Sequence, residues 1–149
     1  MIISHAHRFI FVHCRKVAGS SIKVALAPHL GPDDLVIGSL HEIIENGISL
    51  PDATRRILRK PKARLFTAAA LLKGKSRPEA LNIGLKFYFR GKLSSNPPHP
   101  SAREIEEYFP IEWREYFKFC IVRNPYERLV SDYLWRRRTT GSSRSFREY

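Results

Sequence analysis

Two short apolar segments, each followed directly by a polar turn and a helix, constrain the fold of this chain most strongly. Residues 8–13 and residues 117–122 are rich in β-branched and aromatic side chains, and we predict that each forms a buried strand. An apolar-periodic helix follows the first turn, with the Ser20-Ser21 pair as its expected N-cap, and a second helix is predicted over residues 126–138. Two strands that each lead into a helix predict an α/β fold with a parallel sheet and crossover helices.

The region between these segments is predicted to be mostly helical. Helices are expected over residues 40–44, from Pro51 to before Pro61, and over residues 63–72 and 79–89. Ser101 and Glu104 match the capping box that begins a helix. No repeat or domain boundary is visible in the sequence, so residues 1–149 are predicted to form a single domain. Two strands are too few for a parallel sheet covered on both faces, so either further strands lie in the middle of the sequence or the chain is a fragment. We favour the fragment and expect an incomplete sheet and a missing C-terminal portion of the domain.

The composition narrows the range of partners. Lys and Arg number 26 against 14 Asp and Glu, so the formal net charge is +12. This charge favours an anionic partner: nucleic acid, a phosphorylated cofactor, an acidic glycan or an anionic membrane surface. Two cysteines exclude a disulfide scaffold, and no apolar stretch of the sequence is long enough to span a bilayer. Since the N-terminus also lacks the pattern of a signal peptide, we expect a cytoplasmic protein.

The turn after the first strand, residues 13–21, has the residues of a phosphate-binding loop. In a parallel α/β sheet, ligands bind beyond the carboxyl ends of the strands, where helix N-termini offer unpaired N–H groups. Gly19 would let the backbone approach an anion, Ser20 and Ser21 add hydroxyl donors, and Lys16 adds a positive charge. The lysine precedes the glycine, so this is not a Walker A loop. An ordinary strand-to-helix turn with an exposed lysine would have the same residues.

The turn after the second strand offers a second anion site. Arg123 at the end of the strand could hold a phosphate with two hydrogen bonds, and Ser131, two helical turns further on, could add a hydroxyl. Alternatively, Arg123 could pair with a carboxylate of its own helix such as Glu127. Each loop alone is modest evidence for a ligand.

The two loops together are more specific than either one. Residues 9–22, FIFVHCRKVAGSSI, resemble the 5′-phosphosulfate loop of sulfotransferases, and residues 117–133, FKFCIVRNPYERLVSDY, are similar to their 3′-phosphate motif. The resemblance covers residues 8–26 and 101–135 and points to the carbohydrate-type group that includes the heparan O-sulfotransferases and many bacterial members. It implies a P-loop NTPase-like parallel sheet flanked by helices, with a helical insertion between the two motifs. Arg15 stands where this family usually has proline.

The resemblance also implies a reaction. The donor would be 3′-phosphoadenosine 5′-phosphosulfate (PAPS), whose sulfuryl group passes to a hydroxyl or an amine of an acceptor without a metal. Lys16 would be a catalytic residue that stabilises charge on the bridging oxygen of the leaving group. The residues expected to bind the two phosphate ends of the donor are Arg15, Lys16, Gly19, Ser20, Ser21, Arg123 and Ser131.

A general base is expected to take the acceptor proton. His99 is the first candidate because related sequences often place a histidine just before a similar helix start, although the proline-rich loop around it could equally hold it for structural reasons. His41 is the second candidate. The other histidines are assigned no chemistry: His13 ends the strand, and His5, His7 and His29 are expected at the surface.

Several alternatives stay open at this point. The acceptor is expected to be a carbohydrate, and an acidic glycan would suit the positive charge. Residues 55–64 carry six basic side chains, which form either a solvated helix face or a surface for a polyanion. A nucleic-acid-binding module and an inactive sulfotransferase fragment are the rival interpretations. Cys120 is expected in a buried strand and Cys14 without a partner, both as free thiols.

Overall fold

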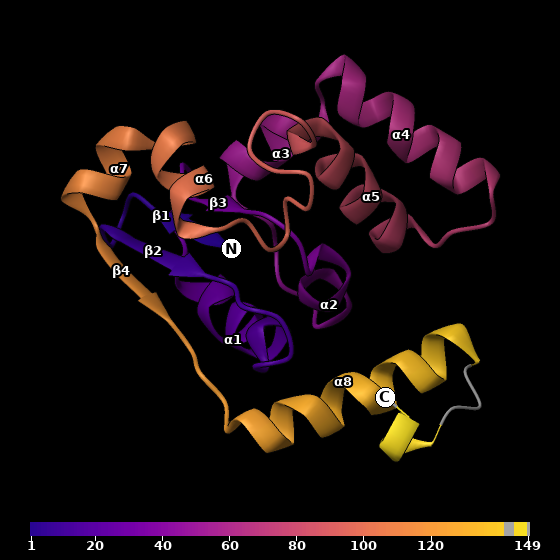
Figure 1. Cartoon of the computed structure of the whole chain (residues 1–149). Helices are drawn as coiled ribbons and strands as arrows, with labels where there is room; N and C mark the ends of the chain where they lie inside the picture. Colours follow the sequence, from indigo (N-terminus) through magenta and orange to yellow (C-terminus); the bar gives the residue numbers. More distant parts are fainter. Residues whose placement is uncertain (142–144, 149) are drawn as a thin grey trace.

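The computed structural model of the protein describes residues 1–141 and 145–148 and shows one four-stranded sheet with helices around it (Figure 1). The strands are β1 (Ile2–Ser4), β2 (Phe9–Val12), β3 (Leu35–Val36) and β4 (Phe117–Cys120), arranged in the order β3-β1-β2-β4. Strands β2 and β4 pair in parallel, with Phe9 opposite Phe117 and Val12 opposite Cys120. The predicted α/β fold and the parallel pairing of these two strands are therefore confirmed.

Two strands were not predicted, and both pair antiparallel. Strand β1 forms a hairpin with β2, and β3 adds to the other edge of β1, so the sheet is mixed. At three and two residues, β1 and β3 are too short to show a periodicity of their own. Their pairing is fixed by contacts with partners elsewhere in the chain.

The helices follow the predicted pattern with small shifts of their ends. They are α1 (Gly19–Leu26), α2 (Leu40–Glu45), α3 (Asp52–Leu58), α4 (Pro61–Leu72), α5 (Arg77–Phe89), α6 (Ala102–Tyr108), α7 (Pro110–Glu115) and α8 (Pro125–Thr140), with short 3₁₀ turns at Ala27–His29 and Phe146–Glu148. Helix α7 was not predicted. It lies between α6 and β4 and has only six residues, too few to show a helical periodicity of apolar side chains.

The start of α6 agrees with the sequence, but the start of α1 does not. The Ser101 hydroxyl accepts from the Glu104 N–H, and the Glu104 carboxylate accepts from the Ser101 N–H at 2.7 Å, which is the predicted capping box. Helix α1 instead begins after Ala18, which has left-handed backbone angles and no side-chain cap. The predicted serine N-cap was therefore wrong, and Ser20 lies inside the helix with its hydroxyl directed elsewhere.

The core lies between the sheet and the helical middle of the chain. Ile10 and Phe11 of β2 are fully buried together with Leu40 of α2, Leu85 of α5 and Ile105 of α6. Helices α4 and α5 pack closely, because a Cβ atom at Gly84 would lie 2.0 Å from the Thr67 hydroxyl and 2.6 Å from the backbone oxygen of Ala63. A glycine at this position thus permits the close approach of the two helices.

The last strand and helix are much more exposed than predicted. Helix α8 leads away from the sheet below α1 and buries none of its residues (Figure 1). The apolar side chains of Leu129, Val130 and Leu134 are half-exposed, and Cys120 is exposed, so the prediction that Cys120 lies in a buried strand was wrong. Strand β4 is the edge of the sheet, and within the described residues nothing pairs with its outer side.

Candidate functional site

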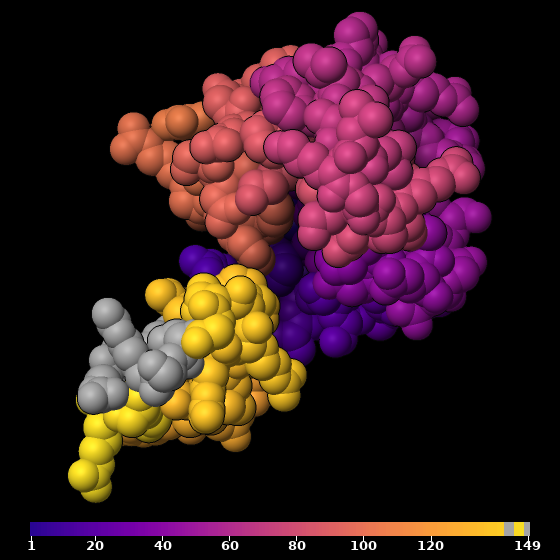
Figure 2. Space-filling view, turned by 90° about the vertical axis from the view of Figure 1, so that its right-hand side faces the viewer, coloured from indigo at the N-terminus to yellow at the C-terminus, as the bar shows by residue number. Residues whose placement is uncertain are grey.

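A cleft of about 710 Å³ lies at the carboxyl ends of β2 and β4 and takes its walls from segments far apart in the sequence. In the space-filling view, the yellow α8 stands apart from the rest of the molecule, with a hollow between them (Figure 2). One wall is the turn after β2 and the start of α1, and a second comes from the end of β4 and α8. The lining includes Arg15, Lys16, Gly19, Ser20, Ser39, His41, Glu42, Asn82, Lys86, Asn96, His99, Arg123, Ser131 and Trp135.

The structure thus brings together most of the residues that the sequence singled out. From the first loop, Arg15, Lys16, Gly19 and Ser20 line the cleft, and from the second loop Arg123 and Ser131 do so. Ser21 is exposed on the outer side of α1 and does not contribute to the lining.

The first loop has an unusual backbone that suits an anion. Lys16 and Ala18 have φ angles of 62° and 59°, left-handed values that non-glycine residues seldom adopt. Left-handed residues in a turn are a feature of backbone concavities that bind anions in other proteins. The ammonium of Lys16 lies 5.1 Å from the ring centroid of Trp135 on α8, which links the two sides of the cleft.

Gly19 is required for a reason that the sequence did not reveal. A Cβ atom there would lie 1.9 Å from Cδ2 and 2.0 Å from Nε2 of His13, so the imidazole ring packs directly against the glycine. His13 is only 7% exposed, and burial is the main cause that lowers its pKa to about 2. His13 is therefore neutral, and its ring packs between the end of β2 and Gly19 at the start of α1.

Positive charge is concentrated where the two loops face the cleft, at Arg15, Lys16 and Arg123. Burial is the main cause that lowers the pKa of Lys16, and the charges of Arg15 and Arg123 lower it further against the opposing effect of Asp132. A smaller adjoining cleft of about 420 Å³ shares Arg15, Lys16 and Arg123 and adds Arg128 and Arg136. A bound anion would relieve the mutual repulsion of these cations.

Arg123 pairs with Glu127, one of the two alternatives that the sequence left open, and it also lines the cleft. Its Nε donates to the Glu127 carboxylate at 3.1 Å, and the same side chain lines the cleft. Both members of this pair are largely exposed, so it contributes at most about 1 kcal/mol to stability. The guanidinium can therefore exchange Glu127 for a ligand phosphate at little cost.

His99 is held in one orientation by the first loop. Its Nδ1 lies 3.0 Å from the backbone oxygen of His13, and because a carbonyl only accepts, Nδ1 carries the hydrogen. The other ring nitrogen, Nε2, keeps its lone pair on a residue that lines the cleft. Burial is the main cause that lowers the pKa of His99, and nearby Lys23 adds to this effect. The ring is therefore neutral near pH 7 and can accept a proton.

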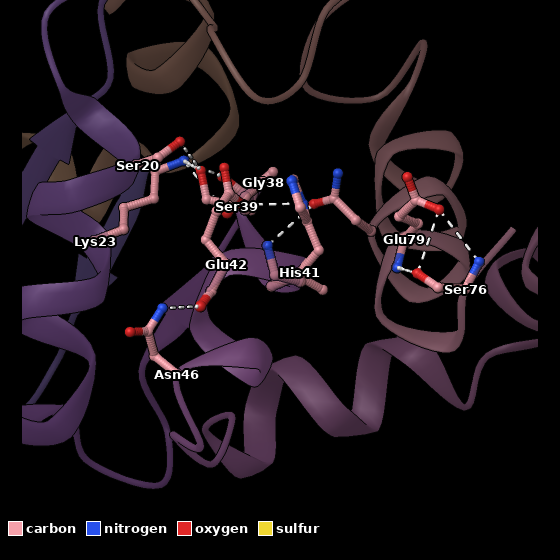
Figure 3. A network of polar contacts seen from close by, with 12 residues as sticks. Ser20, Lys23, Gly38, Ser39, His41, Glu42, Asn46, Ser76 and Glu79 are labelled. Atoms are coloured by element: carbon pink, nitrogen blue, oxygen red, sulfur yellow. Dashed lines mark hydrogen bonds and ion pairs between the residues drawn. The ribbon is translucent and has the colours of Figure 1, made fainter.

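A buried lysine supports the wall opposite the first loop. Lys23 of α1 has no exposed surface, and its ammonium donates to the backbone oxygens of Ile37 and Gly38 and to the Ser39 hydroxyl. Burial lowers its pKa to about 8. The Ser39 hydroxyl in turn lies 2.9 Å from that of Ser20 (Figure 3). This network ties the start of α1 to the turn before α2.

Helix α2 presents two further groups to the cleft. His41 Nδ1 lies 2.9 Å from a Glu42 carboxylate oxygen (Figure 3). The two atoms are close enough for an ion pair, but their geometry is not that of a hydrogen bond. Ser39, the residue before the helix, has a left-handed φ of 63° after Gly38 at 79°. The tight turn at these two residues brings the helix start to the cleft.

Sequence reasoning missed several of these residues. Glu42, Asn82 and Lys86 come from the helical middle and Asn96 from the loop before α6, where no motif marks them. Lys23 lies on one helical face with Gly19 and Ala27, four residues before and after it, but this spacing by itself does not show that the face is buried. The structure shows that all three residues are buried.

Other features of the described residues bear on the earlier expectations. Burial is the main cause that raises the pKa of the Cys14 thiol, and nearby Cys120 adds to this effect. Both thiols are free. His5, His7 and His29 are exposed, as predicted. Within residues 1–141 and 145–148, no cluster of three metal-ligating side chains occurs, and no helix is long and apolar enough to cross a membrane.

Comparison with known proteins identifies the family. The family model described as Sulfotransferase family matches residues 1–145, which include both loops and the helical segment between them. No curated protein and no solved structure matches the chain significantly. The match supports a transferase and favours this interpretation over a nucleic-acid-binding module. With both loops on one cleft and a family match over residues 1–145, the chain belongs to the sulfotransferase family.

Proposed function

We propose that the protein binds PAPS in the cleft and transfers its sulfuryl group to a hydroxyl of an acceptor. The observation that carries this proposal is the convergence of Lys16 and Ser20 from the first loop with Arg123 and Ser131 from the second on one cleft. Two separate cationic loops suit a nucleotide with two phosphate ends. The first loop would take the 5′-phosphosulfate and the second the 3′-phosphate.

The chemistry follows from the charges of the site. The acceptor oxygen attacks sulfur in line, a new S–O bond forms, and the bond to the bridging phosphate oxygen breaks to release adenosine 3′,5′-bisphosphate (PAP). Lys16 stabilises the negative charge that develops on the leaving oxygen. His99 Nε2 takes the acceptor proton, since the His13 carbonyl fixes the other ring nitrogen as a donor. His41 is the second candidate for this role.

The acceptor is proposed to be a carbohydrate. The side of the cleft away from the two loops carries Asn82 and Asn96 amides and the Glu42 carboxylate, groups that bind hydroxyls in pairs. Lys86 on the same wall would suit a carboxylate or a sulfate of an acidic glycan. If the acceptor were an amine, the same histidine would take its proton.

A titration with nucleotides tests the donor assignment directly. The unfolding temperature of the chain is expected to rise saturably with PAP, because a ligand that binds only the folded state stabilises it. Adenosine 5′-monophosphate, which lacks the 3′-phosphate, should bind at least about tenfold more weakly if Arg123 and Ser131 hold that group. Equal binding of the two nucleotides contradicts the assignment, and the absence of a cooperative transition supports the inactive fragment.

The Arg123→Ala variant is expected to weaken PAP binding by about 10- to 100-fold, because a charged hydrogen-bonded pair is lost. Its unfolding temperature should hardly change, since the pair with Glu127 is exposed. Glu127→Gln is the matched control: it removes the same ion pair but leaves the guanidinium, so PAP binding should be retained. Equal loss of affinity in both variants would show that Arg123 acts through Glu127. Calorimetric titration measures both affinities.

The lowered pKa of His99 predicts the pH dependence of the reaction. The neutral ring is the base, and its pKa lies below the ordinary 6.5, so the acid limb of kcat/KM should lie below pH 6.5. His99→Gln is expected to lower kcat by about 10²- to 10⁴-fold with little change in PAP affinity. His41→Gln serves as the comparison. If His41→Gln lost the turnover and His99→Gln kept it, the base would be His41.

A further inference from the structure

Helix α4 has its apolar side chains arranged in the reverse of an ordinary surface helix. Its inner face has the small residues Ala63, Thr67 and Ala70, of which Ala63 and Thr67 lie against Gly84 of α5. Two of its leucines face outward: Leu65 is 67% exposed and Leu72 is 89% exposed. A surface helix normally buries its leucines and exposes polar residues. The arrangement leaves an apolar stripe of Leu65, Ala68 and Leu72 on the outside of the molecule.

The stripe lies in the most cationic part of the chain. Between Asp52 and Glu79 the sequence has nine Lys or Arg residues and no Asp or Glu. By helical geometry, Lys62 and Lys73 flank one side of the stripe and Arg64 the other. Arg55 and Arg56 are paired with carboxylates of Asp52 and Asp33. Among the described residues no ion pair involves Arg59, Lys60, Arg64 or Lys73.

We propose that α4 is a docking surface for an anionic lipid bilayer, with Leu65 and Leu72 inserted among the lipids and the flanking cations at the headgroups. Exposed leucines rimmed by lysine and arginine are the pattern of a helix that lies in a membrane interface. The negative surface of the bilayer complements the cations, and its acyl chains cover the apolar stripe. This accounts for Lys62 and Arg64 of the basic run together with the exposed leucines, which a solvated helix face does not need.

The same features disfavour a nucleic acid at this surface. A nucleic acid would use the cations but would leave the leucines in water, and bases stack on exposed aromatic rings rather than on leucines. The aromatic pair of the region, Phe66 and Phe87, is half-buried and stacked on itself at 4.2 Å between ring centroids. The apolar stripe therefore favours the lipid surface.

Helix α4 lies close enough to the cleft for a bilayer docked on it to be near the proposed acceptor side. Helix α5 lies between them: Gly84 packs against α4, while Asn82 and Lys86, on the opposite face, line the cleft. Figure 1 shows α4 as the outermost element on this side of the molecule. A bilayer at α4 would thus lie about one to two helix diameters, roughly 10–20 Å, from the cleft. The proposal does not depend on the identity of the sulfuryl donor.

Sedimentation of the full chain with vesicles tests the proposal. Phosphatidylcholine vesicles with about 30% phosphatidylserine should bind the chain, and binding should fall as salt is added, because the electrostatic part is screened. Arg64→Gln with Lys73→Gln should weaken binding about fivefold for each cation removed. Leu65→Ser with Leu72→Ser should weaken it about tenfold or more, because the inserted apolar area is lost. These leucines are exposed, so the variant is expected to fold.

A matched control separates this surface from the net charge. Arg103→Gln with Arg114→Gln removes two exposed cations from α6 and α7 and should leave vesicle binding almost unchanged. Equal loss in this control, or full binding by the leucine variant, overturns the proposal. So does sedimentation that does not depend on phosphatidylserine, or tight binding of duplex DNA without binding of vesicles. Thermal unfolding of each variant, followed by circular dichroism, verifies that the fold is intact whether or not the chain binds PAP.

Discussion

Replacing Lys16 by alanine is expected to lower kcat by about 10²- to 10³-fold, the effect of removing one group that stabilises charge in a transition state. The neighbouring cations Arg15 and Arg123 remain, so PAP should still bind, with an affinity that falls much less than kcat does. This split follows from the proposed position of Lys16 at the leaving oxygen, where negative charge increases during the reaction. Steady-state kinetics with PAPS and calorimetric titration with PAP measure the two quantities.

The control for Lys16→Ala must account for the contact of this lysine with an aromatic ring. Lys92→Ala is suitable, because the Lys92 ammonium lies 4.6 Å from the Tyr88 ring centroid just as Lys16 lies over Trp135. It also removes one positive charge. We expect this variant to have unchanged turnover. If Lys16→Ala retained its kcat, Lys16 would have no catalytic role, whatever its effect on binding.

Gly19→Ala is expected to have the largest effect on the structure of the site. The added methyl would lie within 2.0 Å of the His13 ring, which is itself buried, so the ring or the helix start must shift. Overpacking of this kind destabilises by about 1–3 kcal/mol, or roughly 2–10 °C in the unfolding temperature of a chain of this size. Because the His13 carbonyl holds His99, the variant should also lose turnover. Ala25→Ser, on the exposed side of the same helix, is the control.

A double variant distinguishes packing from anion binding as the reason for Gly19. If the methyl fails because it meets the imidazole, adding His13→Ala should restore much of the stability, since the two substitutions then compensate. If Gly19 is needed because a phosphate approaches its backbone, the double variant should stay unable to bind PAP. Thermal unfolding reports the first effect and PAP titration the second, so the two explanations give separate results.

The local pattern of the sequence predicted a large part of the fold. The strands of residues 9–12 and 117–120 pair in parallel as expected, and the capping box at Ser101 begins α6. These features depend on residues within a few positions of one another, through alternation, helical periodicity and cap hydrogen bonds. Strands β1 and β3 have too few residues for such a pattern, and the exposure of Cys120 depends on what covers β4 rather than on its own sequence.

The two polar loops that follow the main strands are what the sequence alone determined about this protein, together with their residues and their order. That they line one cleft was decided by the parallel pairing of β2 and β4. The tertiary structure alone decided that His99 is anchored to His13, 86 positions away, that Lys23 is buried, and that Leu65 and Leu72 face outward. The physical reason is that burial and long-range hydrogen bonds depend on which distant segments meet, and no pattern within one segment carries that information.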